Sequence, residues 1–304
     1  MLKIIRLGRL KLPLVAFLLF LFGVLLAVVS GVSFAIDRFL LGSAIMIAAI
    51  LSVNYGNDYF DYEVDRYSKR TAFSGGSGIL QDNPELIVFA KRFALAMMSL
   101  SIILAAIFTV VFSFPIFFFV FVVVGNLLGW FYAAPPLSLS YRGFSEITTV
   151  AAVGLMLPSL GYLVLKASFD LAFGVFTLPC MLYALAFIIC VEIPDMENDQ
   201  RGNKNTLIAR KGRKFGFTLI AISGSLASLW FLIVQMTNLV HLPVDFRLIT
   251  LLALLPLFSG VLGLVRRTED RNMATKLVNH EISVLTIFLL IVNCYLLILA
   301  RTVL

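Results

Sequence analysis

Acidic side chains are concentrated in two short windows of this 304-residue sequence. Eight of the 17 Asp and Glu residues lie there: Asp58, Asp61, Glu63 and Asp65 in the first window, and Glu192, Asp195, Glu197 and Asp199 in the second. Carboxylates one helical turn apart repel each other, so such clusters need a positive partner. Oxygen ligands without His or Cys suit Mg²⁺, which typically binds one or two carboxylates together with substrate phosphates. The two windows therefore predict a site where more than one Mg²⁺ ion binds a diphosphate.

The spacing of the first window places its oxygen atoms on one face of a helix. A helix turns about 100° per residue, and five side chains then share one sector: Asn54, Asn57, Asp58, Asp61 and Asp65. Glu63 points to the opposite face, and Glu197 in the second window is also expected to face solvent. Asp195 and Asp199 are four residues apart, with Glu192 one turn before them. The metal ligands that this pattern predicts are Asn57, Asp58, Asp61, Asp65, Asp195 and Asp199.

Basic and amide side chains near the windows are candidate contacts for the substrate. The basic candidates are Lys69, Arg70, Arg142 and Lys204. Lys and Arg commonly bind phosphates, but charges in such loops also mark the cytoplasmic side of a membrane protein. The segment 74–78, Ser-Gly-Gly-Ser-Gly, could wrap a phosphate with its backbone N–H groups or form a flexible loop. Asn54 and Asn126 are further substrate candidates, and Asn126 could instead hydrogen-bond a neighbouring helix.

The composition indicates what kind of scaffold positions these residues. Hydrophobic residues make up 61% of the chain and charged residues 13%, whereas soluble domains carry ~45–50% and ~25%. This excess excludes a disordered protein, a disulfide scaffold and an ordinary cytosolic enzyme, and it indicates an all-α, polytopic membrane protein. In such a protein the net charge of +7 marks cytoplasmic loops, so no nucleic-acid partner is expected.

Nine stretches are long and apolar enough to cross a bilayer, which takes about 20 residues. They cover residues 12–35, 39–56, 93–114, 116–133, 147–165, 171–193, 215–236, 248–265 and 282–300. No soluble domain is visible, so residues 1–304 are expected to form a single integral-membrane domain. With these spans, 20 of the 24 Lys and Arg residues fall on one side of the membrane. Since cytoplasmic loops carry the excess of Lys and Arg, we expect the N-terminus and both windows in the cytoplasm and the C-terminus outside.

Both acidic windows contain motifs that resemble those of a known family. The run from Asn57 to Asp65, Asn-Asp-x-x-Asp-x-x-x-Asp, is similar to the NDxxDxxxD motif of the UbiA superfamily of intramembrane prenyltransferases. The run from Asp195 to Asp199 resembles the second aspartate motif of that superfamily. The resemblance covers essentially the whole chain. It implies nine helices around a central cavity open laterally to lipid, two Mg²⁺ ions between the motifs, and an isoprenyl diphosphate whose tail lies in the cavity.

Two loops resemble the MenA-like branch, the dihydroxynaphthoate prenyltransferases of menaquinone synthesis. They are residues 132–146, Tyr-Ala-Ala-Pro-Pro-Leu-Ser-Leu-Ser-Tyr-Arg-Gly-Phe-Ser-Glu, and residues 73–80, Phe-Ser-Gly-Gly-Ser-Gly-Ile-Leu. The sequence departs from many relatives at Pro136, where they carry Lys, and at Asn205, where they carry a basic residue. The resemblance implies Mg²⁺-dependent transfer of an isoprenyl chain to an aromatic quinone precursor, of the dihydroxynaphthoate or hydroxybenzoate type.

The resemblance also suggests how the residues take part in catalysis. Mg²⁺ would make the diphosphate a better leaving group, and an aromatic face such as that of Tyr132 would stabilise the allylic carbocation. The residues expected to be catalytic are Asp58, Asp61, Asp195 and Tyr132. Two alternatives stay open. One is transfer to a glycerol-phosphate lipid such as geranylgeranylglyceryl phosphate. The other is cation-coupled transport, although transporter sites usually lie near the bilayer midplane rather than at the ends of spans.

Overall fold

The computed structural model describes residues 6–9, 11–66, 70–71, 73 and 75–303, so Lys69 lies outside the described residues. Nine helical segments within these ranges are long and apolar enough to span a membrane, as the hydropathy pattern predicts. Eight are single helices: α2 (Lys11–Val29), α3 (Ile36–Phe60), α6 (Ile87–Val111), α7 (Ile116–Ala133), α10 (Leu171–Arg201), α12 (Arg213–Thr237), α13 (Phe246–Val265) and α14 (Arg271–Val303). The fifth span combines α8 (Ser145–Thr149), the π-helical segment η3 (Val150–Met156) and α9 (Leu157–Leu163).

Three helices extend beyond the apolar stretches that predict them. α14 begins at Arg271 rather than at residue 282, and α6 begins at Ile87 rather than at residue 93. α10 continues past residue 193 to Arg201, through Pro194. Hydropathy marks only the part of a helix that crosses the hydrocarbon, whereas the helix itself can continue with polar residues. The extension of α10 matters most, because it carries the second acidic window in helical form.

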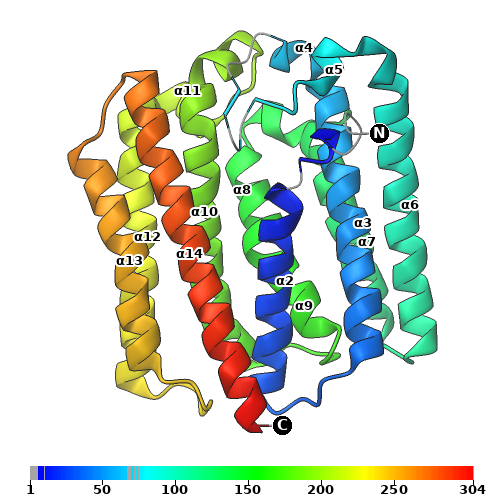
Figure 1. Cartoon of the computed structure of the whole chain (residues 1–304), viewed down its shortest axis with the longest axis vertical. Coiled ribbons are helices and arrows are strands. Elements are labelled where there is room, and N and C mark those ends of the chain that lie inside the picture. Colours follow the sequence, from blue (N-terminus) through cyan, green and yellow to red (C-terminus); the bar gives the residue numbers. More distant parts are fainter. Residues whose placement is uncertain (1–5, 10, 67–69, 72, 74, 304) are drawn as a thin grey trace.

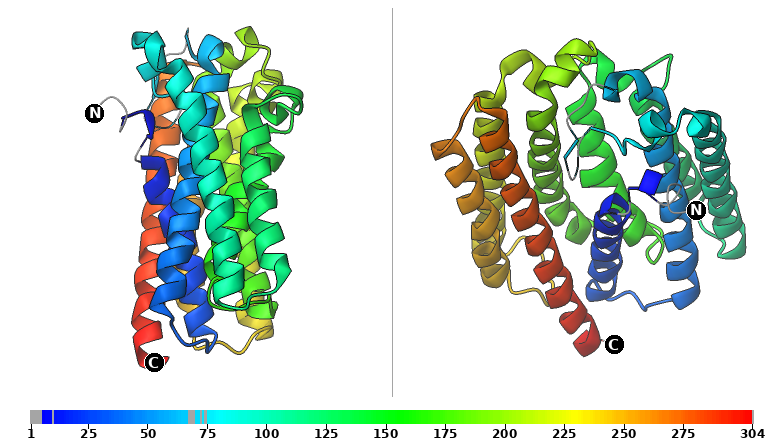
Figure 2. Two further views of the ribbon diagram at one scale, coloured as in Figure 1. Left: turned by 90° about the vertical axis from the view of Figure 1, so that its right-hand side faces the viewer. Right: turned by 45° about the horizontal axis from the view of Figure 1, so that its top comes forward.

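The helices form a bundle with roughly parallel axes (Figure 1). α13 lies at one edge and α6 at the other, while α2 lies between them and packs on α9 and α14. The short segments α4 (Tyr62–Asp65), α5 (Ile79–Asp82) and α11 (Leu207–Lys211) lie over one end of the bundle, which the tilted view in Figure 2 brings forward. α2 begins toward this end and α14 ends at the opposite end, as an odd number of crossings requires.

Two glycines bring α2 and α9 into backbone contact. A Cβ atom on Gly23 would lie 1.9 Å from the carbonyl oxygen of Pro158, and one on Gly161 would lie 1.9 Å from the carbonyl oxygen of Phe20. Small residues at helix crossings allow membrane helices to approach closely and to gain van der Waals contact. This contact holds the fifth span, and with it α8 and η3, against the middle of the bundle.

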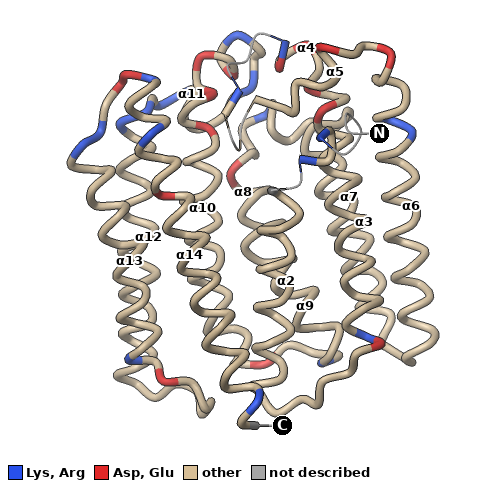
Figure 3. The backbone as a smooth tube through the Cα atoms, in the orientation of Figure 1, with Lys and Arg blue, Asp and Glu red and all other residues tan. Residues whose placement is uncertain are grey.

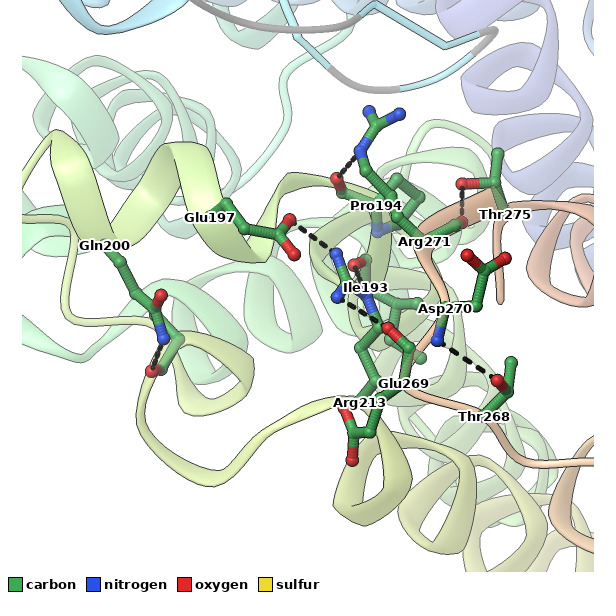
Figure 4. Close-up of polar contacts among 11 residues, drawn as sticks. Ile193, Pro194, Glu197, Gln200, Arg213, Thr268, Glu269, Asp270, Arg271 and Thr275 are labelled. Atoms are coloured by element: carbon green, nitrogen blue, oxygen red, sulfur yellow. Dashed lines mark hydrogen bonds and ion pairs between the residues drawn. The ribbon is translucent and has the colours of Figure 1, made fainter. Parts of the chain in front are cut away.

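A buried arginine ties the end of α10 to the start of α12 (Figure 4). Arg213 is 2% exposed. Its guanidinium donates to the carbonyl oxygens of Ile193 (3.0 Å) and Glu269 (3.1 Å) and to the carboxylate of Glu197 (2.5 Å). The side chain of Glu197 is 45% exposed, so it faces solvent in part, as expected, but is paired. Arg213 and Glu197 therefore hold the helix that carries the second acidic window.

Replacing Arg213 with methionine should destabilise the protein without removing a group from the site. The apolar chain retains most of the volume but loses three hydrogen bonds, and one to a charged group contributes about 1.5–3 kcal/mol. We expect the Tm of the purified protein to fall by several degrees in a thermal-shift measurement. Arg210→Met, at an exposed position in α11, is the matched control and should leave Tm nearly unchanged. Equal Tm values for both variants would contradict the anchoring role.

Candidate active site

A cavity of about 330 Å³ lies between α2, α3, α7, α10 and the fifth span. Along α3 its lining runs from Ile45 to Asp61, which at 1.5 Å per residue covers about 24 Å. Apolar side chains line the part farther from the end of α3, among them Leu19, Met46 and Leu160. Acidic side chains line the part near the end of α3. The cavity therefore has a long apolar part and one charged end.

The first acidic window forms part of the charged end. Asp58 in the last turn of α3, Asp61 at its C-terminal cap and Asp65 in α4 are 4%, 7% and 8% exposed and line the cavity. Asn57 lines it as well, whereas the side chain of Glu63 is 75% exposed. The backbone N–H of Asp65 donates to the carbonyl oxygen of Asp61 over 2.8 Å. The helical path thus continues past the end of α3 and keeps the acidic face together.

Asp61 is bound by two side chains from distant loops. The ammonium of Lys204 lies 2.7 Å from Oδ2 of Asp61, and the hydroxyl of Tyr141 donates to Oδ1 over 2.7 Å. The ammonium also lies 5.1 Å from the centroid of the Tyr141 ring. Lys204 follows the second window in the chain, so its ion pair with Asp61 joins the two windows.

The buried charges shift one another's pKa values. Burial alone would lower the pKa of Lys204, but the neighbouring carboxylates, Asp61 first among them, raise it well above its usual range. Burial and then repulsion from Asp61 raise the pKa of Asp65 to about 7. The site therefore contains more carboxylates than one lysine neutralises, and a divalent cation would relieve this repulsion.

The second acidic window lines the same charged end from α10. Asp199 is 6% exposed and accepts a hydrogen bond from Oγ1 of Thr206 over 3.1 Å. Asp195 lines the cavity and interacts electrostatically with Asp65 of the first window and with Asp199. Carboxylates that are about 130 positions apart in the sequence thus face one space.

The glycine-rich segment covers the first window. The backbone N–H of Ser77 donates to Oδ1 and Oδ2 of Asp58 over 3.3 and 3.2 Å. Gly76 has a φ of +65°, which glycine adopts without strain, and a Cβ there would lie 2.2 Å from Oδ2 of Asp65. The sequence suggests that backbone N–H groups of this segment could bind a phosphate. In this conformation the N–H of Ser77 contacts a carboxylate instead. Ser74 lies outside the described residues.

Arg9 is a cavity residue that sequence reasoning misses. It precedes α2, lines the cavity, and donates from Nη2 to the carbonyl oxygen of Phe73 over 2.8 Å. It also interacts electrostatically with Asp58. Within the part of the chain that the structure describes, Arg9 and Lys204 are the two basic residues that line the cavity. In the sequence, Arg9 cannot be distinguished from the N-terminal charges that mark membrane topology.

Three uncharged candidates line the cavity and have partners within the protein. Tyr132 exchanges a hydrogen bond with Ser145 (2.9 Å), Asn54 donates to the carbonyl of Gly8 (2.9 Å), and Asn126 donates to Ser101 and to the carbonyl of Val122 (3.0 Å each). Ser101 belongs to α6. Asn126 therefore bonds a neighbouring helix and also lines the cavity, and its contact with a substrate stays a prediction.

Two basic residues predicted as phosphate contacts lie away from the cavity lining. Arg70 donates to the carbonyl oxygen of Gly78 over 3.3 Å and lies 3.8 Å from Asp82. Arg142 is exposed and donates to the carbonyl oxygen of Pro136 over 2.8 Å. Both guanidinium groups are thus held by contacts within their own loops. Of the predicted phosphate contacts that the structure describes, Lys204 is the one that reaches the carboxylates.

The donor set suits Mg²⁺, because the polar residues at the charged end offer carboxylate and amide oxygens. No three Asp, Glu, His or Cys side chains among the described residues form one metal-binding group. Mg²⁺ commonly binds one or two carboxylates and completes its shell with water and substrate phosphates. The arrangement fits ions that bind together with a diphosphate.

The protein is a bundle of membrane helices around an apolar cavity, and one end of this cavity is rich in carboxylates. This arrangement defines a class of intramembrane proteins that is suited to ligands with an anionic head and an apolar tail. Residues 16–285 match the model of the UbiA prenyltransferase family. The chain belongs to this family.

Three known proteins show the extent of the similarity. The 1,4-dihydroxy-2-naphthoate octaprenyltransferase of Bacillus subtilis (strain 168) is 23% identical over 181 residues, which cover 59% of this chain and 57% of that protein. A UbiA homolog from Archaeoglobus fulgidus bound to DMAPP and Mg²⁺ matches with a TM-score of 0.69 at 17% identity, over 94% of this chain and 99% of that one. A structure of digeranylgeranylglyceryl phosphate synthase matches with a TM-score of 0.67 at 18% identity, over 96% of each chain. At these identities the structural matches establish the fold.

Proposed function

We propose that this protein transfers an isoprenyl chain from a prenyl diphosphate to an aromatic quinone precursor within the membrane, in a reaction that depends on Mg²⁺. The observation that carries the proposal is one cavity in which Asp61, Asp195 and Lys204 lie at the end of an apolar space. A prenyl diphosphate has an anionic head and an apolar tail, so such a cavity accepts it in one orientation. The DMAPP and Mg²⁺ bound to the Archaeoglobus fulgidus homolog support this assignment.

The diphosphate would bind between the two acidic windows. When bound, Mg²⁺ neutralises the diphosphate and makes it a better leaving group. The residues available to hold two ions are Asn57, Asp58, Asp61, Asp65, Asp195 and Asp199. Lys204 and Arg9 would contact the remaining phosphate oxygens through charge-assisted hydrogen bonds. Lys204 would then exchange its ion pair with Asp61 for a phosphate contact.

The apolar part of the cavity would hold the isoprenyl tail and exclude water. Loss of the diphosphate leaves positive charge on the allylic carbon, which water would quench. The ring of Tyr132 lines the cavity, and its hydroxyl is fixed by Ser145. An aromatic face stabilises a nearby cation by about 0.5–2 kcal/mol. Tyr132 would therefore protect the cation until the ring carbon of the acceptor attacks.

Among acceptors we favour dihydroxynaphthoate, with hydroxybenzoate next. The Bacillus subtilis relative is named for dihydroxynaphthoate, whereas one structural match is named for a glyceryl phosphate product. A glycerol-phosphate acceptor brings a second phosphate that needs its own cation. Arg9 and Lys204, the basic residues of the described lining, both interact with the acidic windows, and Arg142 is exposed. The charge distribution therefore favours an aromatic acid, whose carboxylate carries one negative charge, over a phosphate monoester, which carries up to two.

An assay of the purified protein in lipid nanodiscs tests this function. Prenyl diphosphates of several lengths are combined with dihydroxynaphthoate, hydroxybenzoate or geranylgeranylglyceryl phosphate, and the products are identified by mass spectrometry. We expect a prenylated aromatic product that forms with Mg²⁺ and not with EDTA. Product from geranylgeranylglyceryl phosphate alone would overturn the acceptor. Absence of any product, together with cation flux in liposomes, would favour the transport alternative.

We also propose that the charged end of the bundle faces the cytoplasm. Figure 3 shows Lys and Arg gathered at the end that carries α4, α5 and α11, as expected for cytoplasmic loops. In a variant with Cys294→Ser, a cysteine at exposed Arg267 should react with an impermeant maleimide only after the cells are permeabilised. A cysteine at exposed Arg301 should react in intact cells. The reverse pattern of labelling would contradict this orientation.

A further inference from the structure

Glu192 is a buried carboxylate without a hydrogen bond in the wall of the cavity. It belongs to α10, lies one turn before Asp195, is 4% exposed and lines the cavity. Neither Oε1 nor Oε2 accepts a hydrogen bond from any residue that the structure describes. Leaving a buried polar group unpaired destabilises the protein, and a charged group does so more than a neutral one. An oxygen pair that faces a cavity at this cost points to a ligand that supplies the missing donor.

Two other polar atoms of the same lining also lack partners. Oδ1 of Asn126 and Oγ of Ser140 are buried without a hydrogen bond to a described residue. The Nδ2 group of Asn126 already donates to Ser101 and Val122, so the amide can only accept from a ligand through Oδ1. The two carboxyl oxygens of Glu192 and Oδ1 of Asn126 can accept hydrogen bonds, and the fourth unpaired atom is the hydroxyl oxygen of Ser140. The lining is therefore suited to a ligand that brings hydrogen-bond donors, such as O–H groups.

The neighbours of Glu192 are occupied by other contacts. Ser145 and Glu146 lie close enough to Glu192 for loose polar contacts, but neither meets the distance and angle of a hydrogen bond to its oxygens. Ser145 is paired with the hydroxyl of Tyr132 (2.9 Å), and Glu146 accepts a hydrogen bond from the backbone N–H of Leu207. Among the described residues, the wall at this point contributes the carboxyl group of Glu192, with that of Glu146 behind it outside the lining, so it would disfavour a phosphate bound there.

We propose that Glu192 anchors the acceptor substrate by accepting a hydrogen bond from one of its hydroxyl groups, and that this subsite selects phenols and hydroquinones. The proposal rests on the proposed function and narrows its acceptor class. The helical rise places Glu192 about 4.5 Å farther along α10 than Asp195 toward the apolar part of the cavity. A phenol held there would lie next to the allylic carbon of a diphosphate bound between the acidic windows. A glycerol phosphate has an alcohol hydroxyl but would place its phosphate against the carboxyl group of Glu192.

A pair of matched probes isolates this hydrogen bond. 1-Naphthol and 1-methoxynaphthalene have the same ring system, but only naphthol can donate. Their Kd values are measured by calorimetry on the wild-type protein in nanodiscs and on Glu192→Ala, Glu192→Gln and the control Glu269→Gln, an exposed acid of the α13–α14 loop. Each probe also partitions into the lipid of the nanodisc, and it does so equally for all four proteins. Comparison of the Kd ratios between proteins therefore removes the contribution of this partitioning.

We expect the wild-type protein and Glu269→Gln to bind naphthol about five- to tenfold more tightly than its methyl ether, as one net hydrogen bond provides. In Glu192→Ala the ratio should fall to about one. In Glu192→Gln, which retains the shape of the side chain and one acceptor oxygen, it should lie between these values. A ratio that stays at the wild-type value in both Glu192 variants would overturn the proposal.

Binding of geranyl diphosphate with Mg²⁺ to the same four samples separates this inference from the proposed function. We expect equal affinities in all four proteins, which also shows that the variants are folded. Loss of this binding in Glu192→Gln would make Glu192 part of the diphosphate site and would overturn the acceptor role. If wild-type protein binds no geranyl diphosphate, the proposed function fails, while the naphthol ratios still decide whether a phenol subsite exists.

Discussion

Asp61→Asn should lower prenyl transfer by about 100-fold or more, because a metal-assisted reaction depends on the carboxylate charge at this position. Asp61 accepts hydrogen bonds from Lys204 and Tyr141 at 2.7 Å each, so the site would lose both a proposed metal ligand and the charge that orients the lysine. Asparagine is the better replacement here. Alanine would leave the buried ammonium of Lys204 without a partner, which costs about 3–5 kcal/mol and endangers folding. The measurement is kcat/KM for prenyl transfer, with Tm as the check on folding.

Glu63→Gln is the matched control for this experiment. Glu63 lies two residues from Asp61, its side chain is 75% exposed, and its ion pair with Arg66 at 3.8 Å is solvated. Such surface pairs contribute about 0–1 kcal/mol, so activity should stay close to that of the wild type. Equal losses at Asp61 and Glu63 would refute the assignment of the buried face as the metal-binding face.

Lys204→Met should weaken the binding of prenyl diphosphate by about 10- to 100-fold, the loss that corresponds to a hydrogen bond with a charged group. The side chain of Lys204 is 12% exposed, and methionine fits its space without its charge. The Kd for geranyl diphosphate with Mg²⁺ is the direct readout. Lys211→Met, at an exposed position in α11, is the control and should bind normally. Unchanged affinity in Lys204→Met would show that its ammonium serves only to neutralise Asp61.

The sequence predicts the architecture well because the bilayer restricts it. A spanning segment must be helical and apolar, so the nine spans can be read from hydropathy. The 100° rotation per residue predicts that Asp58, Asp61 and Asp65 share a face, and these residues are buried together. Helix ends are predicted less well, because the part of α14 from Arg271 to residue 281 is polar and resembles a loop.

The parts of the site that sequence reasoning misses depend on contacts between distant segments. Nothing in the local sequence distinguishes Arg9, which lines the cavity, from Arg142, which is bound by Pro136 of its own loop. Similarly, Tyr141 stands out only as part of a loop motif, and its bond to Asp61 spans 80 positions. Glu192 belongs to an acidic window in the sequence, but only the packing of α8 against α10 shows that its oxygens lack partners.

Calorimetric titration of geranyl diphosphate into the purified protein, with Mg²⁺ or with EDTA, tests whether carboxylates from two helices bind a prenyl diphosphate through Mg²⁺. The carboxylates alone repel the diphosphate, so we expect binding with Mg²⁺ that weakens by about 100-fold or more with EDTA, and that is lost in Asp195→Asn even with Mg²⁺. Equal affinity with and without Mg²⁺, or normal binding in Asp195→Asn, would contradict the account.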